Sequence, residues 1–172
     1  MNSYDVLHEL LENELEPEKG LPEPVFEFVS SVTPMVNVDL LVRDERNRVL
    51  LAWREDKFSG KVWHIPGGII RFQEEIETRI HQVAKRELHA DVRWNGQILA
   101  VNEIMSDHQE RGHFISLLVE CELENPRQLQ IYEKSDADRK AGELCWFLEC
   151  PDNFIECQRK VYFNYFLGKG TS

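Results

Sequence analysis

Apolar and polar positions alternate with a period of two in several parts of the chain, which is typical of strands. Met35–Val42 alternates between an apolar face and a more polar face that carries Asp39. Arg48–Trp53 predicts a second strand, and "DERN" between the two predicts a hairpin turn. The segment "VWHI" predicts a short strand that ends at Pro66-Gly67-Gly68.

Helical periodicity begins at about Gln73. Its buried stripe consists of Ile76, Ile80, Val83, Ala84 and Leu88. Strands are then predicted at Val92–Val101 and His113–Cys121, on either side of the polar loop Ser106–Gly112, and again at "LCWFL". Phe154–Leu167 predicts a closing helix. Strands before, between and after two long helices favour a mixed sheet with helices on its faces, an α/β sandwich.

The N-terminal segment has a different character. Apolar residues at helical spacing predict an acidic amphipathic helix, and they are Val6, Leu7, Leu10, Leu11 and Leu15. The Pro- and Glu-rich stretch Glu16–Pro24 predicts a connector. We therefore divide the chain into an N-terminal helix and connector, residues 1–30, and one domain, residues 31–172. The helix is expected to dock onto the domain or onto a second copy, so a homodimer is one hypothesis.

Charge excludes some partners. The chain has 172 residues and a net charge of −11, so a general nucleic-acid or anionic-membrane binder, which needs a basic face, is not expected. The residues from Arg43 to Arg71 nevertheless include seven Lys or Arg residues. This basic segment predicts either a site for a small anion or a solvated strand edge.

Four cysteines, Cys121, Cys145, Cys150 and Cys157, show no Cys-x-x-Cys spacing and no paired His ligands. This spacing argues against a zinc site and favours reduced thiols. No apolar run is long enough for a membrane span, and the acidic N-terminus is unlike a signal peptide. We therefore expect a cytoplasmic protein.

The order strand, "PGG", short loop, Glu, helix and small apolar strand resembles the Nudix hydrolases. This resemblance implies the Nudix fold, an α/β/α sandwich with a mixed sheet. Their box is Gly, five residues, Glu, seven residues, then Arg-Glu-apolar-x-Glu-Glu-x-Gly-apolar. Counted from Gly68, the first acidic position is Glu74. The helical part reads, in order, Gln82 for Arg, Val83 for the first Glu, Ala84 for the apolar residue, Arg86 for the second Glu, Glu87 for the third Glu and His89 for Gly. One helical carboxylate of three is kept.

In a complete box, carboxylates one helical turn apart hold Mg²⁺ ions against a diphosphate. This chain is similar to the GDP-mannose mannosyl hydrolase branch, whose box lacks acids at the same places. The similarity extends from about Ser31 to Phe166, through "TPMVNVDLLV", "VLLAWRE", "RGHFISLLVE" and "QRKVYFNYF". The branch displaces a nucleoside diphosphate from the anomeric carbon of a sugar. Such a reaction needs metal on the leaving group alone, and an imidazole can take the proton of the attacking water.

The resemblance implies a role for each matching residue. His113 would be the base, Mg²⁺ would be held by Glu87, Glu74 and the carbonyl of Gly67, and Arg54 would contact the leaving diphosphate. Asp39 would contact sugar hydroxyls or pair with Arg54. Glu74 is equally placed to cap the helix, and His113 to be a structural histidine.

Two departures from the branch change its expected contacts. Ile69 stands where the branch has an Arg, so Arg71 is the nearby candidate for substrate binding. Gly112 stands where it has a metal-binding side chain. We therefore predict a Mg²⁺-dependent hydrolase of a nucleotide sugar similar to GDP-mannose. The alternatives are a conventional Nudix pyrophosphohydrolase of a nucleotide, or a Nudix-fold module that binds a nucleotide with little or no turnover.

Overall fold

The computed structural model of the protein describes residues 20–56, 59–105, 112–132 and 135–167. The first described element is the helix α2 (Glu23–Val32), which begins after Pro22 and carries a proline in its first turn. Proline suits that position because the first N–H groups of a helix have no partner within it. This helix was not predicted, and it starts inside the predicted connector. The predicted helix near Val6 to Leu15 lies outside the described residues.

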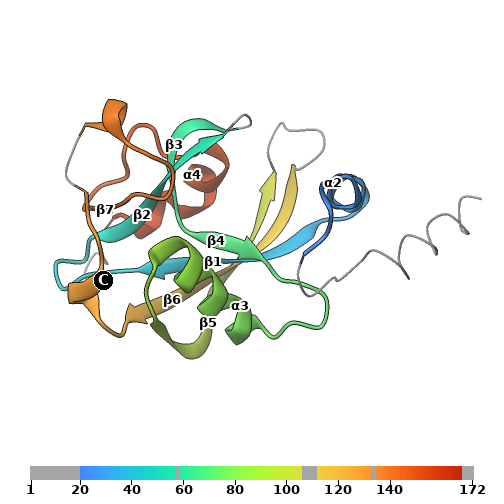
Figure 1. Ribbon diagram of the computed structural model, residues 1–172, viewed down its shortest axis with the longest axis horizontal. Helices are drawn as coiled ribbons and strands as arrows, with labels where there is room; N and C mark the ends of the chain where they lie inside the picture. The colour runs from blue at the N-terminus through green and yellow to red at the C-terminus, as the bar shows by residue number, and fades with distance from the viewer. Residues whose placement is uncertain (1–19, 57–58, 106–111, 133–134, 168–172) are drawn as a thin grey trace, which may run out of the picture.

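In the described part of the chain, seven strands form two sheets (Figure 1). The larger sheet has the order β4-β1-β6-β5, and the smaller has the order β3-β2-β7. The strands are β1 (Met35–Val42), β2 (Val49–Asp56), β3 (Gly60–His64), β4 (Gly67–Ile69), β5 (Val92–Met105), β6 (His113–Leu123) and β7 (Leu144–Phe147). The parallel pairing of β1 with β6, beside antiparallel neighbours, makes the larger sheet mixed, as predicted.

The predicted hairpin between β1 and β2 is wrong in one respect. A turn does form, because Asn47 N–H donates to the carbonyl of Asp44 at 2.9 Å and the Asp44 side chain accepts from two backbone N–H groups. Only the Arg43–Val49 bridge links the strands at this turn, and they then diverge into different sheets. Alternation along a strand predicts the strand itself, but it does not specify the neighbouring strand.

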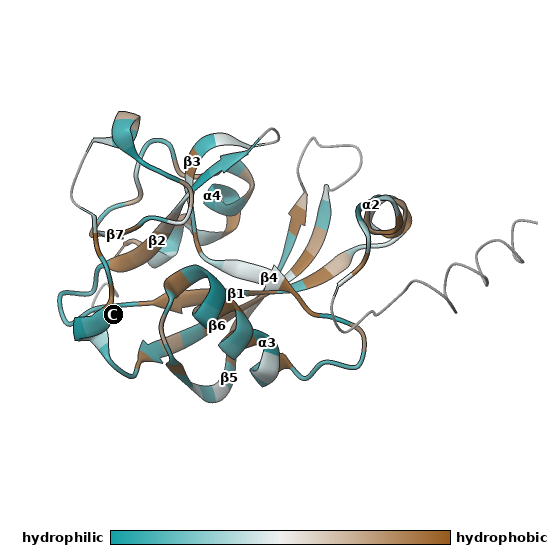
Figure 2. Ribbon diagram, viewed as in Figure 1, coloured by the Kyte–Doolittle hydropathy of each residue, from teal (hydrophilic) through white to brown (hydrophobic). Residues whose placement is uncertain are grey.

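Two helices follow the predicted pattern. The helix α3 (Ile76–Val83) continues into a π-helical turn, η2 (Ala84–Leu88), and α4 (Glu156–Tyr162) continues into a 3₁₀ turn, η5 (Phe163–Tyr165). Short 3₁₀ turns, η3 (Pro126–Gln128) and η4 (Asp136–Asp138), lie between β6 and β7. Figure 2 shows brown, apolar stretches along the strands and teal segments on the helices. None of the described helices is long and apolar enough to cross a membrane.

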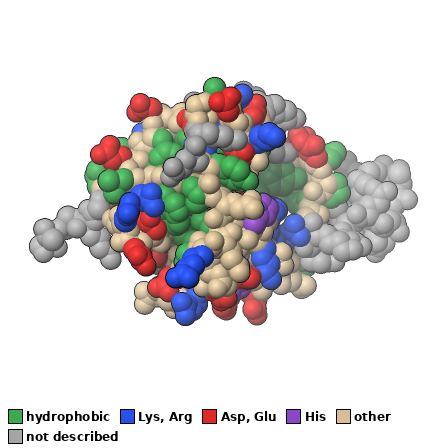
Figure 3. All heavy atoms as spheres, turned by 60° about the vertical axis from the view of Figure 1, so that its left-hand side comes forward, with side chains coloured by type: hydrophobic (Ala, Val, Ile, Leu, Met, Phe, Trp, Pro, Cys, Tyr) green, Lys and Arg blue, Asp and Glu red, His purple; other side chains and the backbone are tan. Residues whose placement is uncertain are grey.

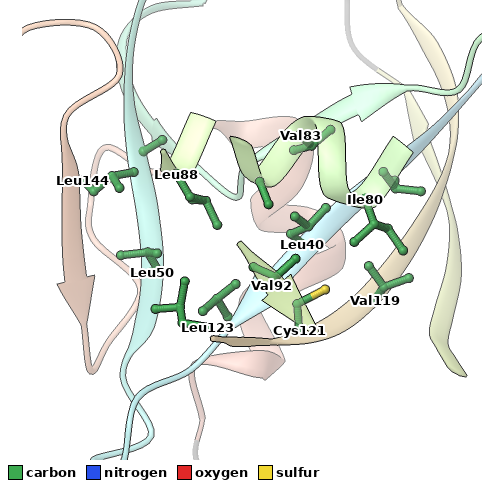
Figure 4. Close-up of a cluster of buried hydrophobic side chains, with 14 residues drawn as sticks. Leu40, Leu50, Ile80, Val83, Leu88, Val92, Val119, Cys121, Leu123 and Leu144 are labelled. Carbon is green, nitrogen blue, oxygen red and sulfur yellow. The ribbon is translucent and has the colours of Figure 1, made fainter. Parts of the chain in front are cut away.

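The core consists of two clusters on opposite faces of β1. On one face, Val38, Leu40 and Val42 pack with the predicted α3 stripe, of which Ile80, Val83, Ala84 and Leu88 are buried (Figure 4). On the other face, Leu41 packs in a cluster that includes Tyr162 and Phe166 from the closing helical segment. Helices therefore cover both faces of β1, and the predicted α/β/α class is confirmed. The domain boundary at residue 30 stays a prediction.

Candidate active site

The site forms where β4 passes β1. Gly67 is the register partner of Asp39, and the neighbouring bonds from Leu40 N–H to the Pro66 carbonyl and from Ile70 N–H to the Val36 carbonyl fix the alternation of the ladder. Gly67 and Asp39 therefore form a non-hydrogen-bonded pair, in which backbones approach closely and the N–H and C=O of Gly67 point away from β1.

Both glycines of "PGG" are required by close contacts. A Cβ at Gly67 would lie 2.1 Å from Asp39 Oδ1, so the carboxylate occupies the space of a side chain at residue 67. A Cβ at Gly68 would lie 2.7 Å from Val83 Cγ2. These two contacts bring β4 against both β1 and α3, and thereby place the carboxylate of Asp39 beside the helix that carries Glu87.

Glu87 joins the loop to the helix. Its Oε2 accepts a hydrogen bond from Gly67 N–H at 3.3 Å, and its Oε1 lies 2.9 Å from Arg86 Nη2. Since the carbonyl of Gly67 points to the same side as its N–H, one carboxylate and one carbonyl oxygen lie on the same side of β4. The other two acidic positions of the box are occupied differently: Val83 is fully buried in the core, and Arg86 is exposed.

Asp39 is buried, with 2 % of its surface exposed. Its Oδ2 accepts hydrogen bonds of 2.6 Å from the hydroxyls of Ser116 and Tyr162, and its Oδ1 accepts one from Asn37 Nδ2 at 2.9 Å. Burial is the main cause that raises the pKa of Asp39 to about 6, and the charge of Glu87 raises it further, while these three hydrogen bonds oppose the shift. The charges of the two carboxylates therefore interact.

A cavity of about 1150 Å³ opens over these residues. It is lined from both sheets, from the loop after β3, from the α3–η2 helix and from the start of α4; its polar lining includes Asp39, Arg54, His64, Arg79, Arg86 and Glu87. A second cavity of about 300 Å³ adjoins it, and both are lined by Arg54, Asp56, His64, Arg86 and Glu87. These five side chains, four of which are charged, therefore form a wall that borders both the large and the small compartment.

The basic segment is divided among different contacts. Arg43 Nη2 donates to the carbonyl of Tyr165 at 2.6 Å, and Arg48 pairs with Asp44 at 2.7 Å. Arg54 and Arg71 line the large cavity, and their role in substrate binding stays a prediction. Figure 3 shows basic and acidic side chains interspersed on one face of the molecule, so positive charge does not gather there into a single large patch.

Glu74, a predicted metal ligand, points toward other partners. Its Oε2 accepts hydrogen bonds from Arg71 N–H at 2.9 Å and from Arg79 Nε at 2.7 Å, and Arg79 Nη2 lies 2.6 Å away. Arg79 is buried, so this ion pair fixes the loop against α3. Of the two roles that the sequence left open for Glu74, these contacts favour the structural one.

His113 lies at the start of β6. Its Nε2 is 3.1 Å from Glu103 Oε1 on the neighbouring strand β5, and it is outside the set of described residues that line the cavities. A different histidine, His64, lines both cavities. His64 was not predicted as a site residue, because nothing in the strand "VWHI" indicates which face its side chain takes. Its position two residues before Pro66 was the available signal.

The ring of His64 is oriented by the backbone. Its Nδ1 lies 3.0 Å from the carbonyl of Ile65, and a carbonyl can only accept, so Nδ1 carries the proton. In the neutral ring Nε2 is then an acceptor. Burial is the main cause that lowers the pKa of His64, although the charge of Glu87 opposes this effect. His64 is therefore neutral near pH 7, which is the state that a proton acceptor requires.

Among the described residues, no three His, Cys, Asp or Glu side chains gather closely enough to hold a metal ion by themselves. Mg²⁺, however, keeps several waters and is commonly held by one or two carboxylates together with substrate phosphates. Glu87, the Gly67 carbonyl and the nearby charge of Asp39 fit one such ion and lack the donors for a cluster.

Part of the chain is similar in sequence to a known protein. A 76-residue segment, 44 % of the chain, is 34 % identical to the low-salt glycan biosynthesis protein Agl8 of Haloferax volcanii, and it spans 48 % of that relative, about half its length.

Solved structures share the fold. A UDP-X diphosphatase superposes with a TM-score of 0.57 at 15 % identity, over 95 % of this chain and 75 % of the other. An ADP-ribose pyrophosphatase from Streptococcus suis 89-1591 superposes with a TM-score of 0.55 at 18 % identity, over 81 % and 94 %. The NUDIX domain family model matches residues 33–149, which contain β1 to β7 and the α3–η2 helix. The chain therefore belongs to the Nudix family.

Proposed function

We propose that the protein is a Mg²⁺-dependent hydrolase of a nucleoside diphosphate linked to a sugar, similar to GDP-mannose, in which water attacks the anomeric carbon. The observation that carries this proposal is the content of the three acidic helical positions of the box. Val83 is buried against Gly68, Arg86 faces the cavities, and Glu87 alone supplies a carboxylate. This set supports one cation under a leaving group rather than the metal cluster of a complete box.

Nudix enzymes generally use divalent metals such as Mg²⁺. In this chain Glu87 and the carbonyl of Gly67 would hold the ion, and the substrate and water would complete its shell. When bound, Mg²⁺ would neutralise the charge that develops on the departing diphosphate. The nearby negative charge of Asp39 would help to attract the ion, and Asp39 would contact sugar hydroxyls. Arg54 and Arg71 would bind the substrate's phosphates.

The reaction balances without a further reactant. The water oxygen forms a bond to the anomeric carbon, the bond from that carbon to the phosphate oxygen breaks, and its electron pair stays with the nucleoside diphosphate. The water proton passes to an imidazole. His113 stays the predicted base, and His64 is a second candidate because it lines both cavities with Nε2 as an acceptor.

The relatives support the substrate class. One relative is named for glycan biosynthesis, and two proteins with this fold are named for the cleavage of ADP-ribose and of UDP-linked compounds. A nucleotide sugar combines these two chemistries. Arg54 and Arg86 in the wall that borders both cavities would also suit a ligand with its diphosphate in the middle.

A screen of nucleotide sugars with Mg²⁺ in H₂¹⁸O tests the proposal. We expect free sugar that carries ¹⁸O and an unlabelled nucleoside diphosphate, identified by mass. Sugar phosphate plus nucleoside monophosphate would instead establish conventional pyrophosphate cleavage. His64→Gln and His113→Gln then identify the base: the variant of the true base loses kcat by about 10²-fold or more with its nucleotide affinity retained.

A binding module is the second candidate function, and it is favoured by the incomplete box, which keeps one helical carboxylate of three, and by Gly112. In that case nucleotide sugars would raise the melting temperature without any metal-dependent product. Both histidine substitutions would then change affinity alone.

A further inference from the structure

Two arginines lie in the wall between the large and the small cavity. Arg54 comes from β2 in the smaller sheet, and Arg86 comes from the π-helical turn η2, yet both line both cavities. Two side chains that border the same two compartments converge on the boundary between them. A ligand that contacted both compartments at this boundary would lie beside these two guanidinium groups.

Each of these arginines is oriented by a neighbouring carboxylate. Arg54 Nε lies 2.6 Å from Asp56 Oδ2, and Arg86 Nη2 lies 2.9 Å from Glu87 Oε1. A guanidinium has five N–H donors in a fixed plane, and one carboxylate oxygen does not use them all. The side chains are also accessible, since 46 % of Arg54 and 60 % of Arg86 are exposed. Both can therefore accept a second anion without breaking the first contact.

Arg86 places a positive charge where the Nudix box has a negative one. It occupies the position of the second helical Glu of the box, and its Nη2 would lie 3.6 Å from a Cβ at Gly68, so it faces the glycine loop. A Glu in this place would attract a cation that in turn attracts a phosphate. An Arg supplies positive charge to the phosphate directly and in a bidentate geometry that a phosphate can use.

We propose that Arg86 is a diphosphate-binding residue. Together with Arg54, it supplies the positive charge that the additional metal ions of a complete box would supply. The pair holds a nucleoside diphosphate at the wall between the two cavities, with one end directed to each compartment. This inference rests on the proposed function for the class of ligand, but it does not require that the ligand is hydrolysed.

Binding without metal is the direct test. Isothermal titration of the full chain with GDP and with UDP in EDTA should show binding of at least one of them, within about tenfold of its affinity in Mg²⁺. Arg86→Gln should weaken this metal-free binding by tenfold or more, as expected for the loss of a charge-assisted contact. Lys85→Gln is the matched control. Lys85 is exposed on the same turn, pairs with Asp91 at 3.8 Å and lies outside the described residues that line the cavities.

A second variant makes the test independent of Arg86→Gln. Arg86→Glu restores the acid of the box, so it should abolish metal-free binding and make binding depend on Mg²⁺ by at least tenfold more than in the wild type. The side chains of Lys85 and Arg86 are both exposed in the wild type. Circular dichroism would verify that the variants fold. The proposal is overturned if the wild type binds neither nucleotide in EDTA, or if Arg86→Gln binds as tightly as Lys85→Gln.

The two proposals fail separately. Binding in EDTA that depends on Arg86, combined with no turnover of any nucleotide sugar, refutes the hydrolase and retains the arginine site. Turnover to sugar and nucleoside diphosphate, combined with no effect of Arg86→Gln on metal-free binding, retains the hydrolase and refutes the arginine site.

Discussion

Asp39 illustrates what a single residue contributes to the site. The chain buries this carboxylate, and its pKa rises from 3.8 to about 6 because of that burial. In the unfolded chain the same group ionises near 3.8. Between these values the folded protein binds more protons than the unfolded protein, so the free energy of unfolding falls as pH rises and becomes constant above about pH 6.

Replacing Asp39 by Asn removes this pH dependence. Because an ionised Asp39 costs about 3 kcal/mol at neutral pH, the stability of Asp39→Asn relative to the wild type should rise by up to about 3 kcal/mol between pH 4 and pH 7. Urea unfolding in EDTA at several pH values measures this difference. A difference between Asp39→Asn and the wild type that does not change with pH would contradict this expectation, because the Asp39 carboxylate would then ionise at the same pH in the folded and the unfolded chain.

His89 provides a second test, at the end of the helical element. It caps η2 in the left-handed region, with φ of 53°, where the family box has Gly. A residue with a Cβ is strained there, and Gly is not. His89→Gly should therefore raise the free energy of unfolding by about 0.5 to 1 kcal/mol. Chemical denaturation checks this value.

The matched control for that change is His89→Ala, which removes the imidazole and keeps the Cβ. It should not stabilise the protein, because the strained backbone remains. Equal stabilisation by Ala and Gly would show that the imidazole, and not the backbone conformation, was unfavourable.

The contact of β4 with α3 can be tested by a double substitution. A Cβ at Gly68 would lie 2.7 Å from Val83 Cγ2, so Gly68→Ala should cost about 1 to 3 kcal/mol by overpacking. Val83→Ala removes the methyl group in question. The double variant should therefore be at least about 1 kcal/mol more stable than the sum of the two single effects, measured by urea unfolding. Additive effects within about 0.5 kcal/mol would indicate that the loop moves away from the helix instead.

Among the individual helices and strands, the periodicity of apolar residues predicted the position of β1 and the buried face of α3. The bounds of β1 agree with the prediction, and four of the five residues of the predicted α3 stripe are buried. Periodicity did not predict which strands pair. β1 and β2 are adjacent in sequence, and yet they belong to different sheets. The helix α2 was missed since Pro22 and Pro24 suggest a connector, although proline is well suited to the first turn of a helix.

The same limit applies to the site. The family resemblance implied Asp39, Gly67 and Glu87 as site residues, and in the structure Gly67 contacts both of the other two. His64 and the pairing of Glu74 with Arg79 were not predicted, because they depend on which way a side chain turns out of a strand or loop. Sequence spacing fixes positions along an element, while tertiary packing decides which side chains share a cavity.

At the scale of the whole molecule, the two sheets are joined by their cores. Leu50 and Ala52 of β2 pack in the α3 cluster with residues of β1 and β6, and Leu51 and Trp53 of the same strand pack in the α4 cluster. Each cluster therefore contains residues of both sheets, and the large cavity is also lined from both. Neither sheet retains a complete core without the other, so we expect them to unfold together.

This cooperativity can be measured with the tryptophans that the chain already has. Trp53, Trp63 and Trp146 lie in the smaller sheet and Trp94 lies in the larger one, so Trp94→Phe leaves fluorescence that reports the smaller sheet alone. The unfolding transitions of the Trp94→Phe variant in urea, followed by fluorescence and by far-ultraviolet circular dichroism, should coincide. A nucleoside diphosphate at 100 times its Kd should shift both equally, by about 2.7 kcal/mol, because a ligand held between the sheets stabilises the single folded state. If the ligand moved the fluorescence transition and left the dichroism transition in place, the sheets would be separate units and the cavity would belong to one of them.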